Sequence, residues 1–162
     1  MSTTRLGEVI PPTPGLELLA RFEVELGKPL EVGEVGTGQR RIIPIVGGRF
    51  RGPRFNGRVL PGGADWQLVQ ADGVARIDTR YALQTDDGAS VFISTGGIRH
   101  GPPEVIAALA RGEWVEPSRY YFRVALRFET GAQAYGWLNR AVAIAAAVRL
   151  PEAVVYDAFL VT

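Results

Sequence analysis

Short runs in which apolar and polar residues alternate strictly recur along most of the chain. The clearest is Arg21-Phe22-Glu23-Val24-Glu25-Leu26, and residues 74–85 and 120–129 show the same alternation. Successive side chains of a β-strand point to opposite faces of a sheet, so these runs predict strands with one apolar and one polar face. Asp72-Gly73 and Asp87-Gly88 stand at breaks between such runs and are typical of tight hairpin turns.

The pattern predicts about nine or ten strands in all. Besides residues 74–85 and 120–129, the expected strands are 28–35, 39–46, 49–51 with 55–60, 65–70, 90–93, 134–138, 141–149 and 153–161. Residues 16–26 are compatible with a strand or a helix by composition, and the alternation in their second half favours a strand. One helix is expected at residues 103–111, because Pro103 opens it and Gly112 follows as a stop. Residues 1–15, with three prolines, are expected to form an irregular N-terminal arm, and residues 16–162 a single β-barrel domain.

Short links between most strands favour antiparallel pairing. A sheet of this many strands closes, or nearly closes, into a barrel, and a sandwich is the alternative. We therefore expect a mainly β fold, an antiparallel barrel of about 8–10 strands with one short helix. A barrel of this size can hold one small ligand.

Composition narrows the class of function. The chain has no cysteine and one histidine, which argues against disulfides and against thiolate or imidazole metal sites. Eighteen basic and seventeen acidic residues are interspersed and give a net charge of +1, without the basic footprint of a nucleic-acid-binding protein. We expect no signal peptide, no membrane span, no cofactor and a cytoplasmic location.

Asp65 and Trp66 are the first candidate site residues, because they directly follow Gly62 and Gly63. Glycines permit positive φ angles or a bulge, and bulges often aim a side chain into a site. Asp65 is then a candidate general base or ligand anchor, and Trp66 a stacking wall. The alternative is a turn aspartate that caps backbone amides beside a core tryptophan.

The direction of the charged strand faces is left open by the sequence. In residues 120–129 one face carries Phe122 and Val124, and the other carries Tyr121, Arg123 and Glu129. The charged face either meets solvent or lines the interior of the barrel. His100, before the expected helix, is a candidate proton shuttle or an exposed bystander.

Several motifs recur together along the chain. They are Gly38-Gln39-Arg40-Arg41-Ile42-Ile43-Pro44-Ile45, Gly57-Arg58-Val59-Leu60-Pro61-Gly62-Gly63-Ala64-Asp65-Trp66, Asp78-Thr79-Arg80-Tyr81, Thr85-Asp86-Asp87-Gly88, Tyr121-Phe122-Arg123, Phe128-Glu129-Thr130 and Trp137-Leu138-Asn139. In this order they resemble the bacterial and fungal family called domain of unknown function 3237, over about residues 15–162. The resemblance implies a lipocalin-like β-barrel, often paired as a homodimer.

Some members of that family look like natural-product enzymes that close an oxygen ring by adding a hydroxyl across an activated alkene. Such a reaction needs a base, hydrogen-bond donors for the developing enolate and a wall that fixes the substrate, but no metal or redox cofactor. Residues within or near the matching motifs can fill these roles: Asp65 or Glu129 as base, Arg40, Tyr81, Tyr121 and Arg123 as donors, Trp66, Phe128 and Trp137 as walls, and His100 beside the substrate.

The leading hypothesis is therefore a cofactor-free barrel enzyme that carries out acid/base cyclisation, hydroxyl addition or isomerisation on a small oxygenated molecule. It predicts that Asp65, Tyr121 and Arg123 converge on one cavity. One alternative is a binding or carrier protein with the same barrel, and another is a structural module whose interior is packed shut. The expected partner is a small-molecule substrate, with no nucleic acid, membrane or metal.

Overall fold

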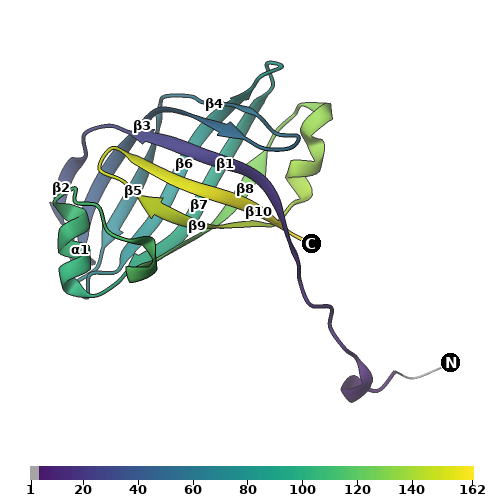
Figure 1. Ribbon diagram of the computed structural model, residues 1–162, viewed down its shortest axis with the longest axis horizontal. Helices are drawn as coiled ribbons and strands as arrows, with labels where there is room; N and C mark the ends of the chain where they lie inside the picture. Colours follow the sequence, from purple (N-terminus) through teal and green to yellow (C-terminus); the bar gives the residue numbers. More distant parts are fainter. Residues whose placement is uncertain (1–3) are drawn as a thin grey trace.

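The strands of the chain form one antiparallel sheet that closes into an eight-stranded barrel (Figure 1). The computed structural model describes residues 4–162. Its strands are β1 (Leu16–Leu26), β2 (Leu30–Glu34), β3 (Gln39–Arg51), β4 (Gly57–Val59), β5 (Gly63–Val69), β6 (Ala75–Thr85), β7 (Ser90–His100), β8 (Tyr121–Glu129), β9 (Ala143–Arg149) and β10 (Ala153–Val161). The predicted antiparallel β-barrel is thus confirmed.

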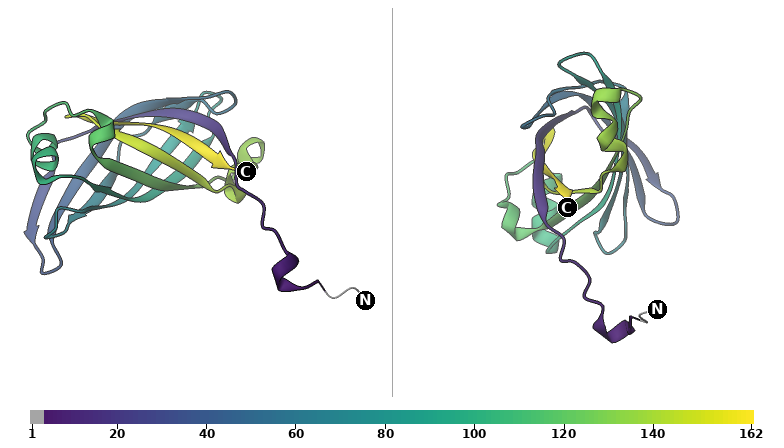
Figure 2. Two further views of the ribbon diagram at one scale, coloured as in Figure 1. Left: turned by 60° about the horizontal axis from the view of Figure 1, so that its bottom comes forward. Right: turned by 90° about the vertical axis from the view of Figure 1, so that its right-hand side faces the viewer.

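The barrel closes because β3 pairs with β1. Neighbouring strands follow the order β1-β10-β9-β8-β7-β6, and β4 and β5 both bridge β6 to β3 at different heights. β3 then returns to β1, while β2 only extends the sheet along β3. The right-hand view of Figure 2 runs close to the barrel axis, so that the strands surround it as a ring.

The charged faces of the long strands meet solvent. In β6 the side chains of Ile77, Tyr81 and Leu83 are buried, whereas Arg76 and Arg80 are exposed. β8 alternates in the same way along its whole length. Of the two directions left open by the sequence, the structure therefore has the apolar face inside, because burying apolar area favours folding and burying unpaired charge opposes it.

Two helical elements lie at opposite ends of the barrel (Figure 1). The helix α1 (Pro103–Ala110) lies at one end, and its Val105 and Leu109 join the core. The 3₁₀ helix η3 (Gln133–Arg140) lies at the other end. The strand expected at residues 134–138 was wrong, because a period of two over so few residues does not separate a strand from a helical turn.

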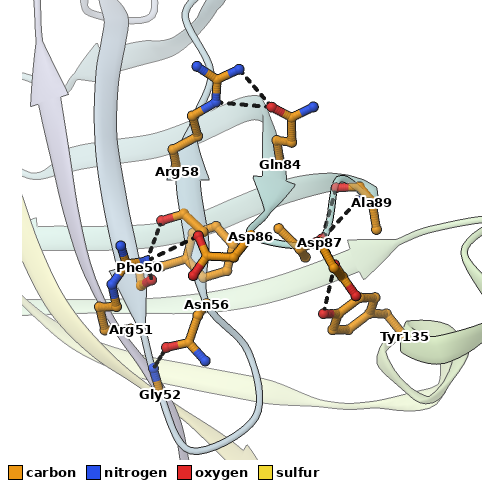
Figure 3. A network of polar contacts seen from close by, with 12 residues as sticks. Phe50, Arg51, Gly52, Asn56, Arg58, Gln84, Asp86, Asp87, Ala89 and Tyr135 are labelled. Carbon is orange, nitrogen blue, oxygen red and sulfur yellow. Dashed lines mark hydrogen bonds and ion pairs between the residues drawn. The ribbon is translucent and has the colours of Figure 1, made fainter.

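The η3 end of the barrel is filled by aromatic rings and held by polar contacts. The rings of Phe50 and Phe55 are tilted by 40° to each other with centroids 4.5 Å apart, and Phe55 meets Phe128 edge-on at 5.9 Å. Above them the Tyr135 hydroxyl donates a hydrogen bond of 3.0 Å to Asp87, as Figure 3 shows. This end is therefore packed, and any internal space lies toward α1.

Two further short elements complete the described chain. Residues 4–15 are exposed and irregular apart from one 3₁₀ turn, η1 (Leu6–Glu8), and η2 (Pro117–Arg119) precedes β8. The first three residues of the expected arm lie outside the described residues. In residues 4–162, no helix combines the length and the apolar character that crossing a membrane requires.

Candidate functional site

A cavity of about 50 Å³ lies inside the barrel, in the half that faces α1. Most of its wall is apolar: Val24, Leu26, Ile43, Ile45, Ile77, Phe122, Val124, Ala147 and Val154. Its polar lining comes from Asp65, Gln67, Thr79, Tyr81, Thr95, Arg99, Arg149 and Tyr156. Sites for drug-sized ligands usually measure roughly 300–1,000 Å³, so this cavity suits a small or slender molecule, or part of a larger one.

Asp65 points into this cavity from β5 and is only 7% exposed. Its Oδ1 accepts a hydrogen bond of 3.0 Å from the backbone N–H of Asp78, and its Oδ2 accepts one of 3.2 Å from the side-chain amide of Gln67. Burial raises the pKa of the Asp65 carboxyl, and these two hydrogen bonds and the charge of Arg99 only partly offset that effect. The carboxyl is thus held in place and made more basic.

The two glycines before Asp65 have different roles. Gly62 has a φ of +111°, which favours glycine, and it forms the turn into β5. A Cβ on Gly63 would lie 2.4 Å from the carbonyl oxygen of Arg80 on β6. The glycine pair therefore lets β5 approach β6 closely, with Asp65 on the inner face.

Arg99 and Arg149 make one side of the cavity cationic. Arg99, at the end of β7, is 8% exposed, and burial together with the nearby Arg149 lowers its pKa to about 10. Burial, aided by the charge of Arg41, also lowers the pKa of Arg149. Within residues 4–162, Arg99 Nε is the buried side-chain nitrogen or oxygen atom that lacks a hydrogen-bond partner.

Hydroxyl groups complete the polar lining. Thr79 and Thr95 face each other from paired strands, with their Oγ1 atoms 2.6 Å apart. Tyr81 and Tyr156 are fully enclosed and share a hydrogen bond, and burial raises the pKa of both phenols. All four hydroxyls stay protonated at neutral pH, so each pair can offer a donor to a bound molecule.

Of the residues predicted from the sequence, Asp65 and Tyr81 line the cavity. Tyr121, Arg123 and Glu129 point to the outside of β8, where Tyr121 is 45% exposed. The expected convergence of Asp65, Tyr121 and Arg123 was therefore wrong, because the alternation of β8 turns Phe122 and Val124 inward instead.

His100 and Trp66 also face away from the cavity. His100 is the last residue of β7 rather than part of a loop, and its ring stacks on Tyr121 with centroids 5.0 Å apart. Trp66 lies on the outer face of β5, with the Arg80 guanidinium 5.8 Å from its ring centroid. Arg40 donates a hydrogen bond of 2.6 Å to the carbonyl oxygen of Trp66 and so supports that outer face.

The remaining predicted walls lie at the η3 end. Phe128 is buried in the aromatic cluster there, and Trp137 lies on η3 with the Arg54 guanidinium 4.0 Å from its ring centroid. Neither borders the cavity. The part of the chain that the structure describes has no group of three or more His, Cys, Asp and Glu side chains arranged to hold a metal ion.

Sequence reasoning missed Gln67, Thr79, Thr95, Arg99, Arg149 and Tyr156 as polar cavity residues. A signal was available for the two arginines. Val91, Ile93 and Thr95 share the inward phase of β7 with Arg99, and three alanines share that of β9 with Arg149. A charged residue on the apolar face of an alternating strand is the sign of a buried charge.

Fold and site together define a small antiparallel β-barrel whose internal cavity has a mostly apolar wall with a few charged and hydroxyl groups. The chain belongs to the family described as Protein of unknown function (DUF3237), whose model matches residues 14–161. A UPF0311 protein of Rhodopseudomonas palustris is 44% identical over 147 residues, covering 90% of this chain and 96% of that protein. The crystal structure of a β-barrel-like protein of Acinetobacter baumannii is 48% identical, with a TM-score of 0.84 over 94% of this chain and 99% of that one.

A more distant relative carries the name of an activity. The hydroalkoxylation enzyme phnH of Penicillium herquei is 28% identical over 133 residues, which cover 82% of this chain and 74% of that protein. The proteins similar to this chain therefore include at least one that is named as an enzyme.

Proposed function

We propose that the chain is a cofactor-free enzyme that performs acid/base chemistry on a small oxygenated molecule in its internal cavity. The proposed reaction is intramolecular addition of a hydroxyl to an activated alkene, or a related cyclisation or isomerisation. The observation that carries the proposal is the buried carboxyl of Asp65 in one apolar cavity with the cationic Arg99 and Arg149. The distant relative named as a hydroalkoxylation enzyme supports it.

Asp65 is the proposed general base. A desolvated carboxylate is a stronger base than one in water, because burial disfavours its charged form. Each of its oxygens accepts one protein hydrogen bond and retains a further lone pair for a substrate hydroxyl. Gln67 positions this carboxylate, and its own side-chain oxygen lies 3.4 Å from a guanidinium nitrogen of Arg41.

The proposed step balances without an external reactant. Asp65 takes the proton of the substrate hydroxyl while that oxygen forms a bond to the far carbon of the alkene. The alkene electron pair moves onto the conjugated carbonyl oxygen as an enolate, and the protonated Asp65 returns its proton to the near carbon. Arg149 and the hydroxyls of Thr79 and Thr95 supply positive charge and donors for the enolate in a water-poor cavity.

The experiment is a ring-closure assay with linear hydroxy-enones, whose hydroxyl can close a five-membered oxygen ring onto the conjugated double bond. Wild-type protein is expected to accelerate closure and to give one enantiomer in excess, because the cavity fixes the folded substrate. Asp65→Asn keeps the shape of the side chain but removes the base, so the rate should fall by roughly 10²–10⁴-fold. Asp86→Asn makes the same change on an exposed aspartate that does not line the cavity, and it should leave the rate unchanged.

Two outcomes would contradict the proposal. If Asp65→Asn and Asp86→Asn close the ring at the same rate, Asp65 is not the base. If the enones bind in the cavity and no product forms above the uncatalysed rate, the barrel is a small-molecule carrier, which is the second candidate function. The homodimer and the cytoplasmic location expected from the sequence stay predictions.

A further inference from the structure

Arg99 is buried without the partners that a guanidinium needs. Its Nε has no hydrogen-bond partner among the described residues, and no ion pair within residues 4–162 joins Arg99 to a carboxylate. Its nearest aromatic neighbour is Phe122, whose ring centroid lies 5.7 Å from the guanidinium carbon. A buried guanidinium without hydrogen-bond partners lowers the stability of the fold. An ion or ligand that accepts its hydrogen bonds explains why a native fold keeps such a group.

Asp65 does not supply the missing hydrogen-bond acceptor of Arg99. Its two carboxylate oxygens are turned to the N–H of Asp78 and the amide of Gln67, so it acts on Arg99 only through space. Among the cavity-lining residues that the structure describes, the charged side chains are Arg99, Arg149 and Asp65. The lining thus carries one more positive than negative charge, and the guanidinium of Arg41 adds further positive charge nearby.

We propose that the cavity binds a small organic carboxylate, seated on the fork of Arg99 with Arg149 as the second cation. This inference rests on the proposed function, since it names the substrate class of that same site: a carboxylate-bearing hydroxy-alkene. A carboxylate matches the planar guanidinium with two parallel hydrogen bonds, which neither a neutral carbonyl nor a single alkoxide can make.

The shape and chemistry of the cavity favour this class over other anions. A cavity of about 50 Å³ with a mostly aliphatic wall accepts a short carbon chain behind the charged group. A phosphate ester brings about two negative charges, which exceeds the single unpaired positive charge of the lining. The carboxylate end therefore lies at Arg99, and the chain extends along Ile43, Ile45 and Ile77 toward the Tyr81–Tyr156 pair.

The direct test is binding of crotonate, a short unsaturated carboxylate, beside its neutral analogue crotonamide. Isothermal titration calorimetry on the wild-type chain should give an affinity for crotonate at least about tenfold above that for crotonamide, because only the carboxylate makes charge-assisted bonds. Crotonate should also shift the Nε–H proton resonance of Arg99, since this atom gains its missing acceptor. That resonance is assigned by its loss in Arg99→Met.

Three variants separate a binding role from a structural one. Arg99→Met keeps a long side chain without charge, so it should lose the preference for crotonate while its unliganded melting temperature stays equal or rises. Arg127→Met makes the same change on the exposed face of β8 and should bind crotonate as the wild type does. Asp65→Asn removes the acidic side chain of the lining and should tighten crotonate binding, although it is expected to slow ring closure.

The outcomes for the two proposals are distinguishable. Equal binding of crotonate and crotonamide, an undiminished crotonate preference in Arg99→Met, or inorganic phosphate that binds as tightly as crotonate would each overturn the carboxylate site. If crotonate binds through Arg99 while no hydroxy-alkene carboxylate is turned over, the site stands and the catalytic proposal fails. If neutral hydroxy-enones are cyclised through Asp65 while crotonate does not bind, the enzyme stands and the substrate class is wrong.

Discussion

The hydroxyl of Tyr81 on β6 hydrogen bonds to the hydroxyl of Tyr156 on β10, and the pair joins two strands that do not neighbour each other in the sheet. Both phenols are fully enclosed and border the cavity. One hydroxyl hydrogen is used between them, and the other is left to donate into the cavity. The pair therefore links the stability of the barrel to the polarity of the site.

Tyr156→Phe leaves the Tyr81 hydroxyl buried without its partner, and we expect it to lower the free energy of unfolding by about 1–3 kcal/mol. The double variant Tyr81→Phe with Tyr156→Phe should cost less than the sum of the single changes, because no polar group is then left unpaired. Urea unfolding of the four proteins in a double-mutant cycle measures this coupling. Strictly additive effects would show that the two hydroxyls do not interact.

The buried carboxyl of Asp65 predicts a pH dependence of stability. Its pKa is raised above the ordinary value of 3.8, so the folded chain binds this proton more tightly than the unfolded chain. The favourable contribution of the protonated group is lost as the pH rises from 3.8 through the folded-state pKa. Asp65→Asn should therefore be more stable relative to wild type above that window than below it.

Urea unfolding of wild type and Asp65→Asn across a pH series tests this sign. The difference between the two free energies of unfolding should change in the direction that favours the variant as the pH rises. A difference that is constant with pH, or one that moves toward the wild type, would mean that burial does not raise the pKa of Asp65.

The strand pattern could be predicted from the sequence, since hairpin turns and alternation are local. The strand at residues 153–161 was predicted with the bounds that the structure has. Residues 16–26 were predicted as a strand only in their second half, where the alternation is strict, and in the structure the whole run Leu16–Leu26 is a strand. β7 was predicted only to residue 93, although it continues to His100. Gly96 and Gly97 resemble a break in the sequence, but both pair with β8.

The cavity could be predicted only in part. Asp65 was found because the glycines before it are a local signal, but which groups face it depends on strands far apart in the sequence. Arg99 and Arg149 are 50 positions apart and come together only because β7 and β9 both flank β8 around the closed barrel. The motif residues Tyr121 and Arg123 were assigned to the cavity although they share the phase of the charged residues Arg127 and Glu129.

Gly96 and Gly97 give a matched pair of substitutions on one strand. A Cβ on Gly97 would lie 2.2 Å from the carbonyl oxygen of Arg123, whereas one on Gly96 would meet nothing within 4 Å. We expect Gly97→Ala to lower the free energy of unfolding by about 1–3 kcal/mol, because β7 and β8 must separate locally. Gly96→Ala should change it by less than about 0.5 kcal/mol.

The same pair tests the geometry of the cavity. Gly97 lies between the inward-facing Thr95 and Arg99, so a shift of β7 at this point moves both side chains. Crotonate affinity should fall in Gly97→Ala and stay at the wild-type value in Gly96→Ala. If the two variants have the same free energy of unfolding and the same affinity for crotonate, the spacing of β7 and β8 at Gly97 does not set the geometry of the cavity.

The contact between Tyr135 and Asp87 holds η3 on the end of the barrel (Figure 3). Hydrogen bonds from the hydroxyls of Thr85 and Tyr135 lower the pKa of the Asp87 carboxyl. A lowered folded-state pKa contributes stability above the ordinary value of 3.8, and that contribution is lost as the pH falls through the folded-state pKa. Tyr135→Phe should therefore destabilise the chain at neutral pH and have a smaller effect in acid.

Thermal unfolding at neutral and acid pH measures the global effect, and amide hydrogen exchange in η3 measures the local one. Exchange in residues 133–140 should become faster in Tyr135→Phe, while exchange in β1 and β10 should not change, because only the anchor of η3 is lost. Tyr121→Phe is the matched control, since its hydroxyl makes no hydrogen bond to the described residues and its ring is exposed on the outside of β8. Equal exchange in the two variants would mean that the burial of Leu138 and the hydrogen bonds between Asn139 and Thr130 hold η3 without the Asp87 contact.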